Sequence, residues 1–172
     1  MFGLFKPRLA PVGPHDISVQ TDIEASAAQV YALLDFADPR NAQRARGAAI
    51  VPSEGCERQF RMVVPQLPDC CFNIDVTDAE SPNHYAYSII AEPQLGRLAA
   101  STEAFTIWDL PGGGCSVRLD AKARLQEGVP EKYLGNEIMK LTLACHNSVA
   151  KLKLQAEQGV EAVEAVQGRL VV

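Results

Sequence analysis

The stretch from Pro130 to Gln158 constrains the fold of this 172-residue chain more than any other. Its apolar residues recur three or four positions apart, which places them on one face of a helix. Pro130 stands where a helix can begin, since proline lacks the amide N–H that a first turn leaves unpaired. Gly159 stands where the helix can end. The apolar face consists of Leu134, Ile138, Leu141, Cys145, Val149 and Leu152.

The segment before this helix, from Ile17 to Gln126, is predicted to consist mostly of strands. Apolar and polar residues alternate over much of it, as they do in a strand with one buried face. The alternation is clearest in residues 115–126, which follow a predicted hairpin loop at Pro111–Gly114. Consecutive strands with such short connections pair antiparallel.

A short helix is predicted after the first strand. Ser26 stands three residues before Gln29, the spacing of a capping box. This helix should stop before Pro39, because the residue that precedes a proline avoids the helical region. Residues 39–47 predict a second short helix with a solvated face. That face would carry Arg40, Arg44 and Arg46.

These elements predict an α+β fold of one domain. A long helix and a sheet that is apolar on one face bury each other, and a sheet of about six or seven antiparallel strands curls. We expect it to wrap around the C-terminal helix. The expected boundaries are an N-terminal arm at 1–15, a domain at 16–158 and a C-terminal tail at 159–172.

The composition excludes several classes of partner. Hydrophobic residues make up 47% and charged residues 22% of the chain, as in an ordinary globule, and the net charge is -5. That charge argues against nucleic acid or an anionic membrane as the main partner. No apolar run reaches the roughly 20 residues that span a bilayer. The N-terminal MFGLFKPRLAPVGP lacks the pattern of a secretory signal, so a cytoplasmic location is expected.

Metal and disulfide chemistry are not indicated. The chain has five cysteines, an odd number, and no CxxC spacing. Its three histidines lack the spacing of a helical zinc site, and no acidic cluster has the spacing of a calcium loop. We expect no metal and no cofactor.

The order of the elements resembles that of the START/polyketide-cyclase/pollen-allergen superfamily, also called SRPBCC or helix-grip proteins. The resemblance rests on DIEASAAQVYALLDFADP (Asp22–Pro39), on the hairpin TIWDLPGGGCSVRLDAKARL (Thr106–Leu125) and on the helix through Leu152. Many bacterial members carry a tryptophan soon after the first helix. This chain has DPRNAQRARG there, which leaves the shape of the cavity mouth open.

The resemblance implies a deep, mostly apolar cavity between the sheet and the long helix. Members of the superfamily bind lipids, sterols, polyketides, hormones or quinones, and some cyclise polyketides or hydrolyse substrates. Others act mainly by binding proteins. The fold alone does not choose among these activities.

Three residues are weak candidates for an acid or base in such a cavity: Glu103, His146 and Tyr133. Glu103 shares strand parity with Phe105 and Ile107, so it would face inward unless a bulge turned it to solvent. An inward carboxyl would have a raised pKa. Each of the three also has a structural interpretation: a surface carboxylate, a histidine on the helix flank and a core tyrosine.

The aromatic and apolar residues at inward positions are the candidates to line a ligand cavity. They are equally candidates for the core. Arg58, which shares parity with Phe60 and Met62, would either pair an anionic head group at the cavity mouth or lie at the surface. The predicted ligand-binding residues are Phe60, Met62, Phe72, Tyr85, Tyr87, Phe105, Trp108, Tyr133, Ile138 and Leu141.

The leading hypothesis is a non-enzymatic domain that binds or carries a small hydrophobic molecule, such as a lipid, a quinone or a polyketide-like compound. The second is a cyclase- or hydrolase-like enzyme that uses one cavity group. The third is a protein-interaction module with a collapsed cavity. It would use an apolar patch on the N-terminal arm (Phe2, Leu4 and Phe5) or on the valine-rich tail.

Overall fold

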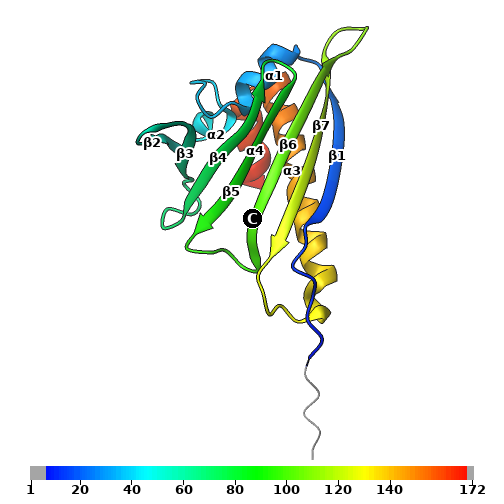
Figure 1. Cartoon of the computed structure of the whole chain (residues 1–172). Helices are drawn as coiled ribbons and strands as arrows, with labels where there is room; N and C mark the ends of the chain where they lie inside the picture. Colours follow the sequence, from blue (N-terminus) through cyan, green and yellow to red (C-terminus); the bar gives the residue numbers. More distant parts are fainter. Residues whose placement is uncertain (1–6, 170–172) are drawn as a thin grey trace, which may run out of the picture.

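The computed structural model describes residues 7–169 and shows one curved antiparallel sheet of seven strands, in the order β1-β7-β6-β5-β4-β3-β2 (Figure 1). All neighbours in this order are consecutive in sequence except β1 and β7, which the chain brings together from its two ends. The strands are β1 (His15–Ile23), β2 (Ala49–Ser53), β3 (Cys56–Val63), β4 (Cys71–Glu80), β5 (His84–Glu92), β6 (Leu98–Asp109) and β7 (Cys115–Leu125).

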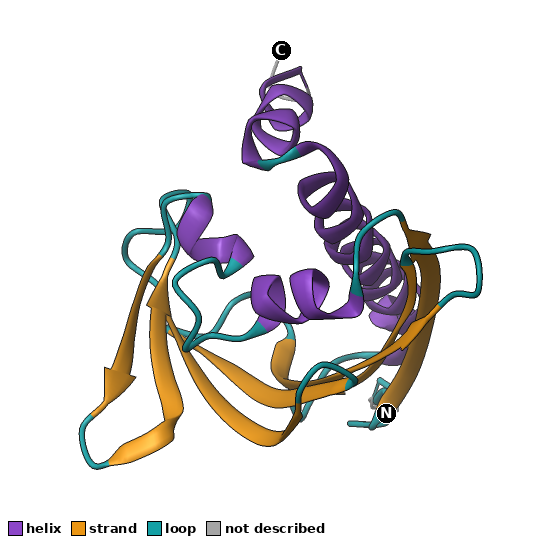
Figure 2. Cartoon of the chain, turned by 90° about the horizontal axis from the view of Figure 1, so that it is seen from above, coloured by secondary structure: helices purple, strands orange, loops and turns teal. Residues whose placement is uncertain are grey.

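The helices lie on the concave side of this sheet (Figure 2). They are α1 (Ala27–Leu34), α2 (Ala42–Ala45), a 3-10 turn at Glu131–Tyr133, α3 (Leu134–Gln158) and α4 (Val160–Arg169). Gly159, with a φ of +89°, ends α3 in a backbone conformation that glycine adopts readily. The predicted helix-grip fold is therefore confirmed, with seven strands and two short helices after the first strand.

The long helix covers only one end of the concave face. It packs mainly on β1, at the edge of the sheet, and makes fewer contacts with β7. Val149 and Leu152, on its predicted apolar face, are buried, and Leu141 and Cys145 are half-buried against the same core. The sequence predicts a helix that fills the concave side; instead α1, which contacts β5, β6 and α3, occupies the middle.

The two terminal segments pack on this domain where the structure describes them. Leu9 bridges to Pro130, and Ala10 donates a backbone hydrogen bond to Val129. On α4, Val163 is 1% exposed and Val166 is 50% exposed. Parts of both predicted terminal segments therefore lie against the main body of the fold.

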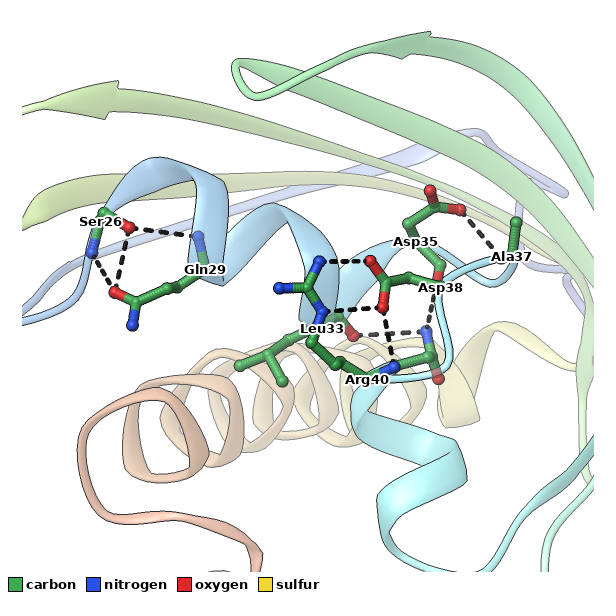
Figure 3. A network of polar contacts seen from close by, with 8 residues as sticks. Ser26, Gln29, Leu33, Asp35, Ala37, Asp38 and Arg40 are labelled. Atoms are coloured by element: carbon green, nitrogen blue, oxygen red, sulfur yellow. Dashed lines mark hydrogen bonds and ion pairs between the residues drawn. The ribbon is translucent and has the colours of Figure 1, made fainter.

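The start of α1 has the predicted capping box. The Ser26 hydroxyl accepts from the Gln29 amide, and the Gln29 side chain accepts from the Ser26 amide (Figure 3). Beyond the end of α1, Asp38 pairs with Arg40 at 2.7 Å (Figure 3). That arginine is exposed, as predicted.

The other two arginines of this segment do not lie on a solvated face. Arg44 donates from Nη1 to the Ile50 carbonyl and from Nη2 to the Phe36 carbonyl, at 2.8 and 3.0 Å. Arg46 turns toward α3 and is half-buried. The prediction was wrong for both, because this four-residue helix is too short to present one uniform face to water.

Asn41 joins α1 to α2. Its side chain is 1% exposed, and its Nδ2 donates to the carbonyls of Leu33, Leu34 and Asp35 at 3.1–3.3 Å. Its Oδ1 accepts from the amide of Gln43 at 2.9 Å. One buried side chain thus satisfies carbonyls at the end of one helix and caps the start of the next.

We predict that Asn41→Ala lowers the free energy of unfolding by about 2–3 kcal/mol, because it leaves several buried carbonyls without a donor. Asn41→Asp should also destabilise, since it keeps the acceptor but places a carboxylate oxygen against those carbonyls. Urea denaturation measures both. Asn136→Ala, at an exposed position of α3, is the control and should have little effect. Equal stability of Asn41→Ala and wild type would contradict this account.

Candidate functional site

A groove lies between α3 and the side of the molecule formed by α2 and the end of β3. Its widest part, the mouth, has a volume of about 440 Å³. Two smaller parts adjoin it, one of about 130 Å³ under the middle of α3 and one of about 50 Å³ between α1 and α3. Ser148 lines all three parts, so we treat them as one groove. Its size is typical of small-molecule sites.

The inner part under α3 exists because the surfaces that face each other carry small side chains. Ala121 and Ala123 of β7 and Ser101 of β6 form its floor, and Ala144 of α3 forms part of its roof. Larger residues at these positions would close the space between helix and sheet. The space stays open because the small side chains that line it do not reach across from the helix to the sheet.

A polar pair joins the two smaller parts of the groove, since Glu103 lines the part under α3 and Tyr87 lines the part between α1 and α3. Glu103 of β6 stands directly across from Tyr87 of β5 in the sheet register. The Tyr87 hydroxyl donates to Glu103 Oε2 at 2.6 Å. Burial raises the pKa of Glu103, although the hydrogen bond from Tyr87 acts in the opposite direction. Burial, with the adjacent carboxyl, raises the pKa of Tyr87 well above its ordinary value.

Cys145 of α3 lines the same inner part as Glu103. Burial, together with the nearby Glu103 carboxyl, raises the pKa of the Cys145 thiol to about 11. The thiol is therefore protonated near neutral pH and is a poor nucleophile. The five cysteines are all free in the structure.

The three predicted acid–base candidates lie in different places. Glu103 faces the groove, as its strand parity indicates. His146 is exposed on α3 and lines no part of the groove. Tyr133 lies at the far end of α3, half-buried beside Leu125 and Val129, with the Arg97 guanidinium 4.1 Å from its ring centre.

Glu137, in the first turn of α3, has a structural role. It accepts hydrogen bonds from Arg97 at 2.8 Å and from Lys140 at 3.2 Å. Burial raises the pKa of Glu137, but these two bonds outweigh burial, so the pKa is lowered. The pair with Arg97 ties the loop before β6 to the start of α3.

The predicted ligand-binding residues divide into three groups. Tyr87, Phe105 and Leu141 line the groove. Four more belong to the hydrophobic core around the groove or pack against it: Phe60, Met62, Phe72 and Tyr85. The last three, Trp108, Tyr133 and Ile138, do not line the groove.

Trp108 is a correction to the sequence-based prediction. Side chains alternate between the two faces of a strand, and Phe105 and Ile107 are the buried residues of β6. Trp108 therefore lies on the opposite, convex face. Trp108 was predicted to line the cavity because it is large and aromatic, although its strand parity differs from that of Phe105 and Ile107. Arg58 is exposed on β3 and away from the groove, which agrees with the surface alternative and not with a cation at the cavity mouth.

The mouth of the groove contains residues that the sequence reasoning missed. Arg46 and Gln43 enter it from the region of α2, and Ser148 and Lys151 from α3. The signal for the helix side was available: Ala144, Ser148 and Lys151 recur four and three positions apart, a stripe of small and polar residues beside the apolar face. No signal in the sequence distinguished Arg46 from a surface arginine.

The sequence also predicts no metal site and no membrane-spanning segment. Within residues 7–169, no group of three or more His, Cys, Asp and Glu side chains could hold a metal ion. No helix in the described part of the chain is both long and apolar enough to cross a membrane. The predicted interaction residues Phe2, Leu4 and Phe5 lie outside the described residues.

Comparison with solved structures identifies the same fold elsewhere. DynU16, from the dynemicin biosynthetic locus, superposes with a TM-score of 0.60 at 16% identity over 84% of this chain and 48% of its own. A START superfamily protein from Mycobacterium smegmatis gives 0.54 at 16% identity over 91% of this chain and 99% of its own. The di-domain ARO/CYC StfQ, from the steffimycin biosynthetic pathway, gives 0.56 at 15% over 82% and 50%.

These similarities confirm the predicted resemblance at the level of the fold. This chain spans about half the length of DynU16 and of StfQ. No protein-family model matches the sequence, and no curated protein matches it either. Sequence identities this low support a shared fold but do not assign an activity to the chain.

We predict that Glu103→Gln becomes more stable relative to wild type as the pH rises from about 4 to about 8. Because the folded-state pKa of Glu103 is raised, the stability that its proton contributes is complete below the ordinary carboxyl pKa. That contribution is lost as the pH rises through the raised value. The glutamine side chain of the variant does not titrate, so its contribution to stability does not change with pH in this range. Urea denaturation of both proteins at several pH values measures the difference.

Glu137→Gln is the matched control, with the opposite sign. The pKa of Glu137 is lowered, so its contribution is present above the ordinary carboxyl pKa and is lost as the pH falls. This variant should lose stability relative to wild type as the pH rises. Parallel pH profiles for the two variants would show that the pKa of Glu103 is not raised in the folded protein.

Proposed function

We propose that this chain, which has the helix-grip fold shared by START-like proteins, binds a small hydrophobic molecule in the groove beside α3. The observation that carries the proposal is the hydrogen-bonded Tyr87–Glu103 pair: Glu103 lines the mostly apolar part under α3, and Tyr87 lines the adjoining part between α1 and α3. A cavity with an apolar lining and a few fixed polar groups is the usual form of a small-molecule site.

The chemistry of the inner part restricts the ligand. Most of the lining is alanine, leucine and isoleucine side chains, which favour an apolar body, and Ser101 and Ser148 also line it. The Glu103 carboxyl and the Tyr87 hydroxyl offer a single polar contact, suited to a hydroxyl or carbonyl oxygen of the ligand. The START-like and ARO/CYC names among the structural neighbours agree with a ligand of this class, such as a lipid or a polyketide-like compound.

Native mass spectrometry of freshly purified protein, followed by organic extraction, tests for a bound ligand. The proposal predicts a stoichiometric small molecule, or binding of one from a panel of lipids, quinones and polyketide-like compounds by protein that is isolated empty. Protein that is empty and binds no member of the panel would contradict the proposal.

A substitution that fills the groove locates the binding site. Ala144 lines both the mouth and the inner part, and it is exposed to the groove, so Ala144→Leu should leave the fold intact. We expect at least a tenfold loss of affinity for the ligand, roughly the effect of 1.4 kcal/mol of lost binding energy. Calorimetric titration measures it.

Ala150→Leu is the matched control. Ala150 is also exposed on α3 but lines no part of the groove, so the same change there should leave affinity unaltered. Equal losses for the two variants, or none for either, would place the ligand elsewhere on the protein.

One observation favours an enzyme as the second candidate function. Burial raises the pKa of Glu103 toward neutral pH, which is the direction that favours a carboxyl as a general acid or base. In a cyclase-like reaction Glu103 would exchange a proton with a carbonyl or enol oxygen of the bound ligand. Glu103→Gln separates the two functions: an enzyme would lose turnover while it still bound its substrate, whereas a carrier has no turnover to lose.

A further inference from the structure

Two cations face the mouth of the groove without a counter-ion. Arg46, just after α2, and Lys151, on α3, both line the mouth. Neither forms an ion pair with any residue in the described part of the chain. The ion pairs of α3 there involve different cations: Arg97 and Lys140 pair with Glu137, and Lys153 pairs with Glu157. Two like charges that share a concave surface repel each other, which a folded protein tolerates at some cost in free energy.

The Arg46 guanidinium has a buried, unused donor. Its Nη1 has almost no solvent contact and makes no hydrogen bond in the structure. Buried donors are nearly always paired, and an unpaired one destabilises the folded state. Burial lowers the pKa of Arg46, and burial together with the charge of Arg46 lowers the pKa of Lys151. Both side chains are therefore short of anionic partners in the empty protein.

Apart from the two cations and Glu164, the lining of the mouth is neutral, with four polar side chains beside the apolar Ala48, Val64, Pro65 and Ala144. The side chains of Gln43, Gln66, Asn147 and Ser148 offer hydrogen-bond donors around the two cations. Glu164 of α4 also lines the mouth, but it is exposed and forms no ion pair with either cation within the described residues. The local charge of the mouth is positive in a chain whose net charge is -5.

We propose that Arg46 and Lys151 bind the anionic head group, a carboxylate or a phosphate, of an amphiphilic ligand whose apolar body enters the groove toward Tyr87 and Glu103. This inference rests on the proposed function, because it assigns the ligand class of the same groove. Arg46 supplies a fork of donors from one wall and Lys151 a point charge from the other, so a head group between them contacts both α2 and α3.

The geometry explains why the cations stand at the mouth and the carboxyl at the base. A charged head group keeps part of its hydration at the open end, where desolvation costs least. The inner part is apolar, with one buried carboxyl that would repel an anion. An amphiphile therefore has one favourable orientation, with its head outward.

Calorimetric titration with three ligands of equal chain length tests the inference: dodecanoate, dodecyl phosphate and dodecanol, each below its micelle concentration. We expect the anions to bind about tenfold or more tightly than the alcohol, the effect of one charge-assisted contact. The comparison of the two anions distinguishes a fatty-acid-like ligand from a phosphate-bearing one.

Three variants assign the effect to the named residues. Arg46→Gln and Lys151→Gln should each weaken dodecanoate binding about tenfold and change dodecanol binding by less than about twofold. Neither should destabilise the empty protein, because neither cation has a partner to lose. Arg58→Gln is the control, since Arg58 is exposed on β3 and away from the groove; it removes the same charge and should leave both affinities unchanged.

The outcomes separate this inference from the proposed function. If dodecanol binds as tightly as dodecanoate, and the two variants affect both equally, the head-group site is wrong and the hydrophobic groove stands. If none of the three ligands binds, the head-group site is wrong, and the panel of lipids, quinones and polyketide-like compounds decides the proposed function. If Arg58→Gln weakens dodecanoate as much as Arg46→Gln does, the effect is one of overall charge and the assignment of the mouth is overturned.

Discussion

The position of α3 on the sheet determines the rest of the structure. The helix packs on β1 and β7, where its leucine and valine face meets the alternating apolar residues of those strands. Because the contact is at one end of a curved sheet, the concave face of the remaining strands must be covered by something else. The short helices α1 and α2 cover part of it (Figure 2), and the groove lies in the space that they and α3 leave between them.

The polar residues of the groove follow from this arrangement. Glu103 and Tyr87 lie on the central strands β6 and β5, so they reach the groove from below. Arg46, just after α2, and Lys151, on α3, reach the groove from its two sides. The groove is thus apolar at its middle, acidic at its base and basic at its mouth. An amphiphilic molecule with a polar group at each end would match that distribution.

Local patterns in the sequence were sufficient for the fold and for the inward position of Glu103. The period of the 130–158 stretch, the capping box at Ser26 and the alternation of residues 115–125 correspond to α3, α1 and β7. Parity on β6 placed Glu103 with Phe105. Trp108, a large aromatic residue on the outward face of β6, shows where residue type misled the prediction. The role of Arg46 was not predictable, because it depends on how closely α2 approaches α3, and no local pattern encodes that distance.

The central claim, that ligands bind in the groove beside α3, is tested most directly by two-dimensional amide NMR during titration with dodecanoate. The account predicts that the largest shifts arise around Arg46 after α2, Glu103 on β6, and Ala144 and Ser148 on α3, three segments that meet at the groove. Shifts concentrated instead on the outer side of α3, around the exposed Met139 and Leu143, would contradict it. A titration without any specific shift would do the same.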